Sequence, residues 1–380
     1  MTTAAVVMPA GSAQGSVGTI LGADRPGRVE GSYIVVLKEQ SKSAAALPDL
    51  VDRYGGEVRT VWQHAMNGYL VRMPAAKAAR LAADPRVAYV EQDGEVRAQD
   101  VQPNPPSWGL DRIDQRNLPL NSSYTYNTTA SNVTAYVIDT GVSLTHSTFG
   151  GRVTWAINTT FDNNNSDCNG HGTHVAGILA GAEHGVAKAA NIVAVKVLNC
   201  WATGLVSGII TGVDWVTANA VKPAVANMSL GAYGGSDMSL DQAVRNSIAS
   251  GITYVVASGN ANSNACSTTP ARVPEAITVN ASTTTDRRAE FSNYGNCTDI
   301  WAPGENIFSA WHQNDSYFIT KSGTSAAAPH VAGAAALWLA SHPTDSPAAV
   351  ANALLTRATT NKITDVVGSP NRLLYVGGMT

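Results

Sequence analysis

The stretch VTAYVIDTG, residues 133–141, decides the fold class. A largely apolar run ends in Asp139, and the turn residues Thr140 and Gly141 follow at once. A short apolar run bounded by turn residues is typical of a strand that is buried on both faces of a parallel sheet. Polar groups that end such strands lie beyond the carboxyl edge of the sheet, where α/β proteins build their sites.

Further apolar runs follow this stretch, and helical runs separate them. The additional strands are predicted over residues 191–198, 224–231, 252–260 and 276–282. The helices are predicted to begin near Gly172, Val206, Leu240 and Thr324. This alternation predicts an α/β fold with a mostly parallel sheet and helices on both of its faces.

The region before this sheet has a different pattern. It predicts a strand over 32–39, a helix over 43–55, a hairpin around Asn67 and Gly68, a helix over 75–85 and a strand over 87–98. That βαββαβ order indicates a small α+β domain over residues 27–100, and a Pro-rich linker at 101–108 separates it from a large domain over 101–380. Residues 1–26 are expected to be the remnant of an export signal or disordered.

Composition narrows the class of protein. The 380 residues are 44% hydrophobic and 14% charged with a net charge of −3, and no long Lys/Arg run is present, which argues against a nucleic-acid partner. The sequence contains no run of about 18 apolar residues, so no membrane-spanning helix is predicted. The four cysteines form no CxxC pair, so they suit either two disulfides in a secreted protein or four buried thiols.

Three motifs place polar side chains at the ends of predicted elements. Asp139 follows the first strand, His171 and His174 open a small-residue helix, and Ser325 opens another in GTSAAAPHVAG, residues 323–333. A serine hydroxyl is a poor nucleophile unless an imidazole takes its proton, and the imidazole needs a carboxylate to fix its tautomer. Taken singly, Asp139 could merely cap a turn, and the histidines could be a metal pair, although no HExxH glutamate is present.

The order Asp, His, Ser is the order of subtilisin. With VIDTGV, NGHGTHVAG and GTSAAAPHVAG in that order, the chain from about Trp108 onward resembles the subtilisin-like serine proteases (subtilases), above all their proteinase K and aqualysin branch. The resemblance implies Ser325 as nucleophile, His171 as general base and Asp139 as orienting acid. It also implies that Asn260 and the Ser325 N–H stabilise the oxyanion, and that residues 27–100 are an inhibitory propeptide.

Substrate contacts are expected from backbone segments. A peptide could add as a β-strand to an edge formed by Ala202, Thr203, Gly204, Leu205 and Val206. Its side chain before the scissile bond would enter a pocket between Ser229, Leu230 and Gly231 on one side and Ala257, Ser258 and Gly259 on the other. These walls are small and uncharged, so we expect broad specificity with an apolar or aromatic residue at that position.

Calcium is the expected cofactor. Asp111, Asp114 and Gln115 share one helical face, which suits either Ca²⁺ or a solvated surface. The resemblance implies a calcium site there, with further oxygens where Asn121 and Ser123 stand, and a second site from Asp299 with the carbonyls of Pro274 and Ala276. Asp162 and Asp167 are a weaker third candidate. The resemblance also implies the disulfides Cys168–Cys200 and Cys266–Cys297.

Together these features predict a secreted, monomeric serine endopeptidase that acts on protein and peptide substrates. The precursor would cut itself between about Ala98 and Gln102, and its own propeptide would inhibit it. Two alternatives remain open: a catalytically inactive binding protein of the same fold, and an esterase with the same triad. Assays with casein and with a small ester would separate them.

Overall fold

The computed structural model describes residues 17–24, 28–38, 47–63, 66–94, 100–232 and 237–379. The chain forms two compact units, residues 1–97 and 98–380. Most of the expected export segment lies outside the described residues, and so do Ala98 and Gln99 in the expected cleavage region.

The N-terminal unit contains a five-stranded sheet and two helices. Its elements are β1 (Ile20–Leu21), β2 (Arg28–Leu37), α1 (Leu47–Tyr54), β3 (Glu57–Trp62), β4 (Gly68–Arg72), α2 (Ala75–Ala82) and β5 (Val87–Gly94). The strands lie in the order β1-β5-β2-β4-β3, all antiparallel except β1 and β5. The predicted βαββαβ order is present, with the short strand β1 added before it. Buried residues of the helices, such as Val51 and Leu81, form one core with Val35 and Val71 of the sheet.

The large unit is built on a nine-stranded sheet with the order β17-β18-β14-β13-β12-β11-β8-β10-β9. Its strands are β8 (Thr134–Asp139), β9 (Val153–Asn158), β10 (Asn191–Lys196), β11 (Ala224–Met228), β12 (Thr253–Ala257), β13 (Ile277–Ser282), β14 (Ile300–Pro303), β17 (Thr359–Thr360) and β18 (Arg372–Leu373). Every pair is parallel except β17 and β18. The predicted mostly parallel sheet is therefore confirmed.

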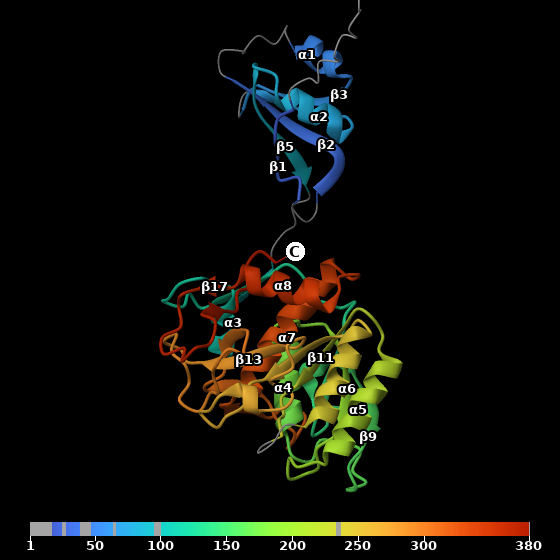
Figure 1. Ribbon diagram of the computed structural model, residues 1–380, viewed down its shortest axis with the longest axis vertical. Helices are drawn as coiled ribbons and strands as arrows, with labels where there is room; N and C mark the ends of the chain where they lie inside the picture. The colour runs from blue at the N-terminus through green and yellow to red at the C-terminus, as the bar shows by residue number, and fades with distance from the viewer. Residues whose placement is uncertain are drawn as a thin grey trace, which may run out of the picture. The chain divides into compact units, whose positions relative to one another are not determined.

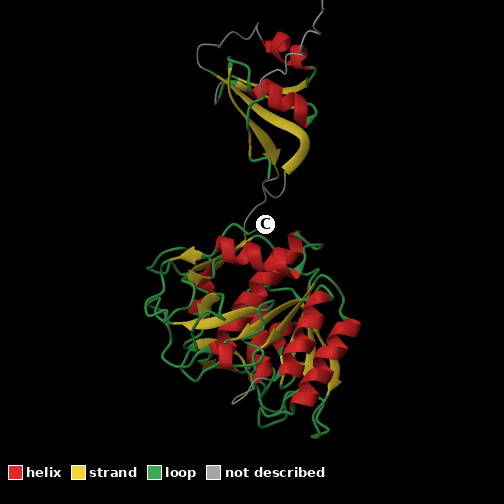
Figure 2. Cartoon of the chain, in the orientation of Figure 1, coloured by secondary structure: helices red, strands yellow, loops and turns green. Residues whose placement is uncertain are grey.

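Helices cover both faces of this sheet (Figures 1 and 2). They are α4 (His171–Ala180), α7 (Thr324–Ser341) and α8 (Pro347–Arg357) on one face, and α5 (Val206–Asn219) and α6 (Met238–Ala249) on the other. Along β8, Ala135 and Val137 belong to the first core, and Tyr136 and Ile138 belong to the second. Both faces of the strand are therefore buried, which is why its sequence is almost wholly apolar.

Smaller elements complete the large unit. These are α3 (Trp108–Ile113), the antiparallel pair β6 (Asp100–Pro103) and β7 (Ser123–Tyr126), and the hairpin β15 (Ile307–Ala310) and β16 (Phe318–Lys321). Among the described residues, no helix is long and apolar enough to cross a membrane.

The carboxyl end of β8 lies at a switch point of the sheet. The strand lies between β10 and β11, so the chain leaves it toward one side of the sheet and later returns on the other. Ligands of open α/β sheets bind at such a switch point. Asp139 ends β8 at this place.

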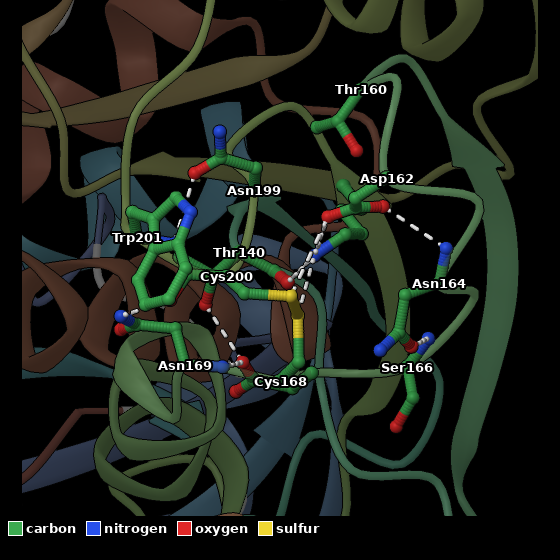
Figure 3. Close-up of a disulfide and its surroundings, with 12 residues drawn as sticks. Thr140, Thr160, Asp162, Asn164, Ser166, Cys168, Asn169, Asn199, Cys200 and Trp201 are labelled. Atoms are coloured by element: carbon green, nitrogen blue, oxygen red, sulfur yellow. Dashed lines mark hydrogen bonds and ion pairs between the residues drawn. A yellow bond between two sulfur atoms is a disulfide. The ribbon is translucent and has the colours of Figure 1, made fainter.

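All four cysteines are paired. Cys168 is bonded to Cys200 and Cys266 to Cys297, so the alternative of four buried thiols is wrong. The first disulfide joins the segment before α4 to the end of the β10 region, and Asn169 Nδ2 donates to the Cys200 carbonyl at 3.1 Å beside it (Figure 3).

Candidate active site

Asp139 and His171 form the centre of the candidate site. The Nδ1 atom of His171 lies 2.7 Å from Oδ1 of Asp139, whose side chain is fully buried, whereas the His171 side chain remains 32% exposed. Burial alone would lower the pKa of His171, but the charge and hydrogen bond of Asp139 outweigh burial and leave that pKa raised. The imidazole is therefore oriented by a carboxylate and open to the pocket on its other side.

Ser325 is the second residue of α7 and lines the same pocket as His171. No hydrogen bond joins the two side chains in the structure, as is common before substrate binds. The backbone N–H of Ser325 donates to none of the described residues, because the first N–H groups of a helix have no partner within it. This group is thus available to an anion near the serine hydroxyl.

Pro329 lies one turn after Ser325 and cannot donate the usual helical hydrogen bond to the Ser325 carbonyl. Ser229 compensates, since its Oγ donates to that carbonyl at 2.9 Å. Asn227 Nδ2 in turn donates to the Ser229 hydroxyl at 2.9 Å, and both residues are buried. Ser229 is predicted to bind substrate, and its side chain also fixes the first turn of α7.

Asn260 is exposed, and its side-chain amide lies close to the Ser325 hydroxyl. Its Oδ1 accepts hydrogen bonds from the N and the Oγ1 of Thr324, both at 2.8 Å, which leaves Nδ2 as the free end. A Cβ on Gly323 would lie 3.5 Å from this Nδ2 and 3.2 Å from Ser325 Oγ. The amide donor and the serine hydroxyl therefore flank one point, where Gly323 leaves space.

A pocket of about 450 Å³ joins these groups to the predicted substrate segments. Its lining includes His171, Ser325 and Asn260 together with Ala202, Thr203, Gly204, Val206, Ser229, Leu230, Gly231, Ala257 and Gly259. Apart from His171, the described residues that line it are uncharged. An extended, largely apolar segment would fit these walls.

Two predicted substrate residues do not line this pocket. Leu205 lines a separate cavity of about 730 Å³, which shares only Thr203 and Gly204 with the first. Ser258 is fully buried, with its N–H donating to the Val279 carbonyl and its carbonyl accepting from Asn293 Nδ2. Their predicted contacts with the substrate, which for Leu205 would be through its main chain, remain predictions.

Sequence reasoning missed several residues that line the pocket, namely Leu198, Ile209, Ala232, Thr268 and Thr324. They come from separate segments and carry no local signal. His174 and His330 are both buried, and each bonds to a backbone carbonyl. His174 Nε2 bonds to the Ile307 carbonyl at 3.2 Å, and His330 Nδ1 bonds to the Ala326 carbonyl at 2.8 Å.

The first calcium candidate has the chemistry of a cation site. Asp111 accepts the N–H groups of Asn121 and Ser122, and Asp114 accepts that of Thr125. The buried Oδ1 of Asp114 has no partner among the described residues, and burial, reinforced by the charge of Asp111, raises the Asp114 pKa to about 6. Two neighbouring carboxylates with one orphaned oxygen fit a hard cation.

The other residues at this site contribute less. Asn121 Oδ1 accepts the N–H and the hydroxyl of Ser123, so both side chains bond to each other. Gln115 donates to the carbonyls of Asn117 and Pro119, which leaves its Oε1 for a cation. Asn121 and Ser123 are therefore weaker candidates than the two carboxylates.

The second candidate is centred on the carboxylate of Asp299. Asp299 Oδ2 accepts the Thr278 N–H at 2.8 Å, and burial raises the Asp299 pKa to about 6. The carbonyls of Pro274 and Ala276, which precede β13, are the proposed partners. An oxygen-rich site of this kind suits calcium.

The weaker third candidate does not fit calcium. Asp167 accepts five hydrogen bonds, and Asp162 already pairs with the buried ammonium of Lys196 at 3.4 Å (Figure 3). The neighbouring sulfurs of Cys168 and Cys200 are in a disulfide and offer no thiolate.

Comparison with known proteins agrees with this geometry. Residues 130–374 match the subtilase family, and residues 32–99 match the peptidase inhibitor I9 family. An extracellular serine proteinase of Thermus sp. (strain Rt41A) is 48% identical over 97% of this chain and 94% of its own length. Alkaline serine exoprotease A of Vibrio alginolyticus is 46% identical over 90% of this chain and 67% of its own length.

A solved structure gives the same result. The crystal structure of a cold adapted subtilisin-like serine proteinase is 52% identical, with a TM-score of 0.68. The match covers 71% of this chain and 97% of that one.

Proposed function

The chain belongs to the subtilase family, and on that premise we propose that it is a secreted serine endopeptidase made as a self-processed precursor. The observation that carries the proposal is the hydrogen bond between Asp139 and His171 at the mouth of the pocket that Ser325 lines. Secretion is supported by the extracellular relative and by the two disulfides, which persist in oxidising compartments.

The proposed reaction is acyl transfer through a Ser-His-Asp triad. His171 takes the proton of the Ser325 hydroxyl as Oγ attacks the scissile carbonyl, and later gives that proton to the leaving amine. Asp139 holds the imidazole in the required tautomer and stabilises its charged form. Water then attacks the acyl-enzyme with His171 again as base, and Ser325 is released.

Two donors would stabilise the oxyanion that forms at each attack. They are Nδ2 of Asn260 and the N–H of Ser325, which flank the space left by Gly323. Donors fixed before the reaction cost no reorganisation when charge develops. The anchoring of Asn260 Oδ1 by Thr324 supports this role.

The pocket suggests the preferred substrate. A peptide strand would lie along residues 202–206, with an apolar or aromatic side chain between 229–231 and 257–259. Main-chain hydrogen bonds are independent of sequence, so specificity would be broad. The I9 domain would inhibit the peptidase until it is cut off and degraded.

Calcium would stabilise the mature enzyme. Asp111, Asp114 and the carbonyl-rich segment around Asp299 would hold it as a structural ion. Because it binds only folded protein, calcium raises the free energy of unfolding.

The test compares wild type with Ser325→Ala. We expect the wild-type precursor to be cut between about Ala98 and Gln102 and then to hydrolyse casein, while the variant stays uncut. Maturation of the variant without added protease would refute self-processing. Hydrolysis of a small ester without hydrolysis of casein would favour an esterase, and inactivity on both would favour a binding protein.

A further inference from the structure

Helix α4, which carries His171 as its first residue, has no capping side chain of its own. Its N-cap is Gly170, with φ of 104°, a conformation that side chains rarely adopt. A Cβ there would lie 2.4 Å from His312 Nδ1 and 2.5 Å from Trp311 Cε2. Glycine is therefore required, and the first N–H groups of the helix need acceptors from elsewhere.

Three neighbouring side chains supply these acceptors. The N–H of His171 donates to Asn169 Oδ1 at 3.2 Å, that of Gly172 to Thr140 Oγ1 at 2.9 Å, and that of Thr173 to Asp167 Oδ2 at 2.9 Å. The first turn of the helix is thus held by the strand end at Thr140 and by the preceding loop.

Asp167 is the centre of this arrangement. Its Oδ1 accepts the N–H groups of Asn169 and Gly170 and the hydroxyl of Thr140, at 3.0, 2.7 and 3.0 Å. Its Oδ2 accepts both the N–H and the hydroxyl of Thr173, the latter at 2.5 Å. The residue is only 4% exposed, so these five hydrogen bonds are shielded from water.

The same contacts connect His171 to Asp139. Thr140 directly follows Asp139, and its hydroxyl donates to Asp167 while it accepts from Gly172. The two backbones approach closely here, since a Cβ on Gly172 would lie 2.0 Å from the Gly141 carbonyl oxygen and 3.2 Å from Asp139 Cβ. Asp167 therefore bonds both to the strand end that bears the acid and to the helix that bears the base.

We propose that Asp167 is a positioning residue for the peptidase reaction, which sets the separation and alignment of Asp139 and His171 through the first turn of α4. The inference rests on the proposed function. An ordinary helix cap would contribute only to stability, whereas a positioning residue affects the chemical step. A small misplacement of catalytic groups costs up to about 100-fold in rate.

The test is Asp167→Asn, which preserves the shape of the side chain but removes its charge. The new amide NH₂ group is a donor, so it cannot accept the hydrogen bonds that one carboxylate oxygen accepts now. Trace wild-type enzyme, removed afterwards, matures the precursor, so impaired self-processing does not hide the effect. We expect kcat on a peptide substrate to fall about 10- to 100-fold while KM changes less than about two-fold.

The pH profile gives a second readout. The negative charge of Asp167 contributes to the raised pKa of His171, after the larger effects of burial, which opposes it, and of Asp139. Removing that charge lowers the His171 pKa, so the acid limb of kcat/KM should move to lower pH. A loss of stability alone would not move this limb in assays well below the melting temperature.

Ser346→Ala is the matched control, because it removes the side chain that caps α8 through the Ala349 N–H. It should lower the melting temperature and leave kcat and the acid limb unchanged. The same result for Asp167→Asn would overturn the inference and make Asp167 a simple cap.

Thr173 keeps the inference testable if Asp167→Asn does not fold. Thr173→Val removes the hydroxyl that bonds to Asp167, and Thr173→Ser keeps it. We expect a lower kcat in the valine variant and wild-type kcat in the serine variant, while equal kcat values in both would overturn the inference. Failure of wild-type enzyme to cut casein would instead refute the proposed function itself.

Discussion

His184 gives a sharp prediction about acid stability. It is 4% exposed, and neither ring nitrogen has a hydrogen-bond partner among the described residues. Its ring stacks on Phe318 at 4.4 Å between centroids. Burial, reinforced by the nearby charges of Lys188 and His146, lowers the pKa of His184 from 6.5 to about 4.

The size and sign of the effect follow from this shift. The unfolded chain binds a proton at His184 below pH 6.5, and the folded chain does so only below about pH 4. The stability that depends on neutral His184 is therefore complete above pH 6.5 and is lost as the pH falls to 4. Lowering this pKa from 6.5 to about 4 corresponds to about 3 kcal/mol of stability at neutral pH.

His184→Leu should remove this contribution without breaking any hydrogen bond to the described residues. Mature enzyme inactivated by a sulfonyl fluoride is unfolded in urea at several pH values between 7 and 4 and followed by tryptophan fluorescence. The free energy of unfolding should fall by about 3 kcal/mol less in the variant than in wild type over this range. His174 and His330, whose burial lowers their pKa values to about 3 and about 4, should maintain the remaining slope.

Phe318→Leu is the control for packing. It removes the stacking partner and keeps the histidine, so it should destabilise the enzyme at every pH without changing the slope. Parallel stability curves for wild type and His184→Leu would show that this histidine does not drive acid unfolding.

Three further predictions concern calcium, the oxyanion site and the first turn of α7. EDTA should lower the melting temperature, and Asp114→Asn should remove part of that calcium dependence; an EDTA effect of unchanged size in the variant would exclude Asp114 as a ligand. Asn260→Leu should lower kcat by about 100- to 1000-fold with little change in KM, the range found when an oxyanion donor was removed from a subtilisin. Retained kcat would exclude Asn260 as that donor. Ser229→Ala leaves the Ser325 carbonyl without its donor, so it should cost about 1–3 kcal/mol of stability, seen in urea unfolding; no loss would mean that water replaces the hydroxyl.

Much of the fold was predictable because its strands are buried on both faces. Apolar runs such as 133–138 have no other stable place in an α/β protein, and the helices between them force parallel pairing. The strands β9 and β14 escaped prediction. β9 lies at the edge of the sheet, and four of its six residues are only partly buried, so its sequence carries a mixed pattern. β14 has four residues, too few for a periodic signal.

The candidate site was predictable where chemistry demands a residue type at an element end. Asp139, His171, Ser325 and Asn260 all have this property. The last three line one pocket, and the buried Asp139 bonds to His171 beside it. The supporting contacts were not predictable, since Ser229 lies 96 residues from Ser325 and Asp167 lies 27 from Thr140. Such partners depend on which loops the folded sheet brings together, and no local spacing encodes that.

Glycine explains why the supports of α4 and α7 come from outside each helix. Gly170 precedes His171 and Gly323 stands two residues before Ser325, and neighbouring side chains lie close to where a Cβ on either would stand. A glycine cannot cap the helix that it begins, so the acceptors and donors around each helix start must come from other segments. At α4 the principal one is Asp167, and at α7 they are Ser229 and Asn260. Each of these two helix starts is therefore held by side chains that lie outside the helix itself.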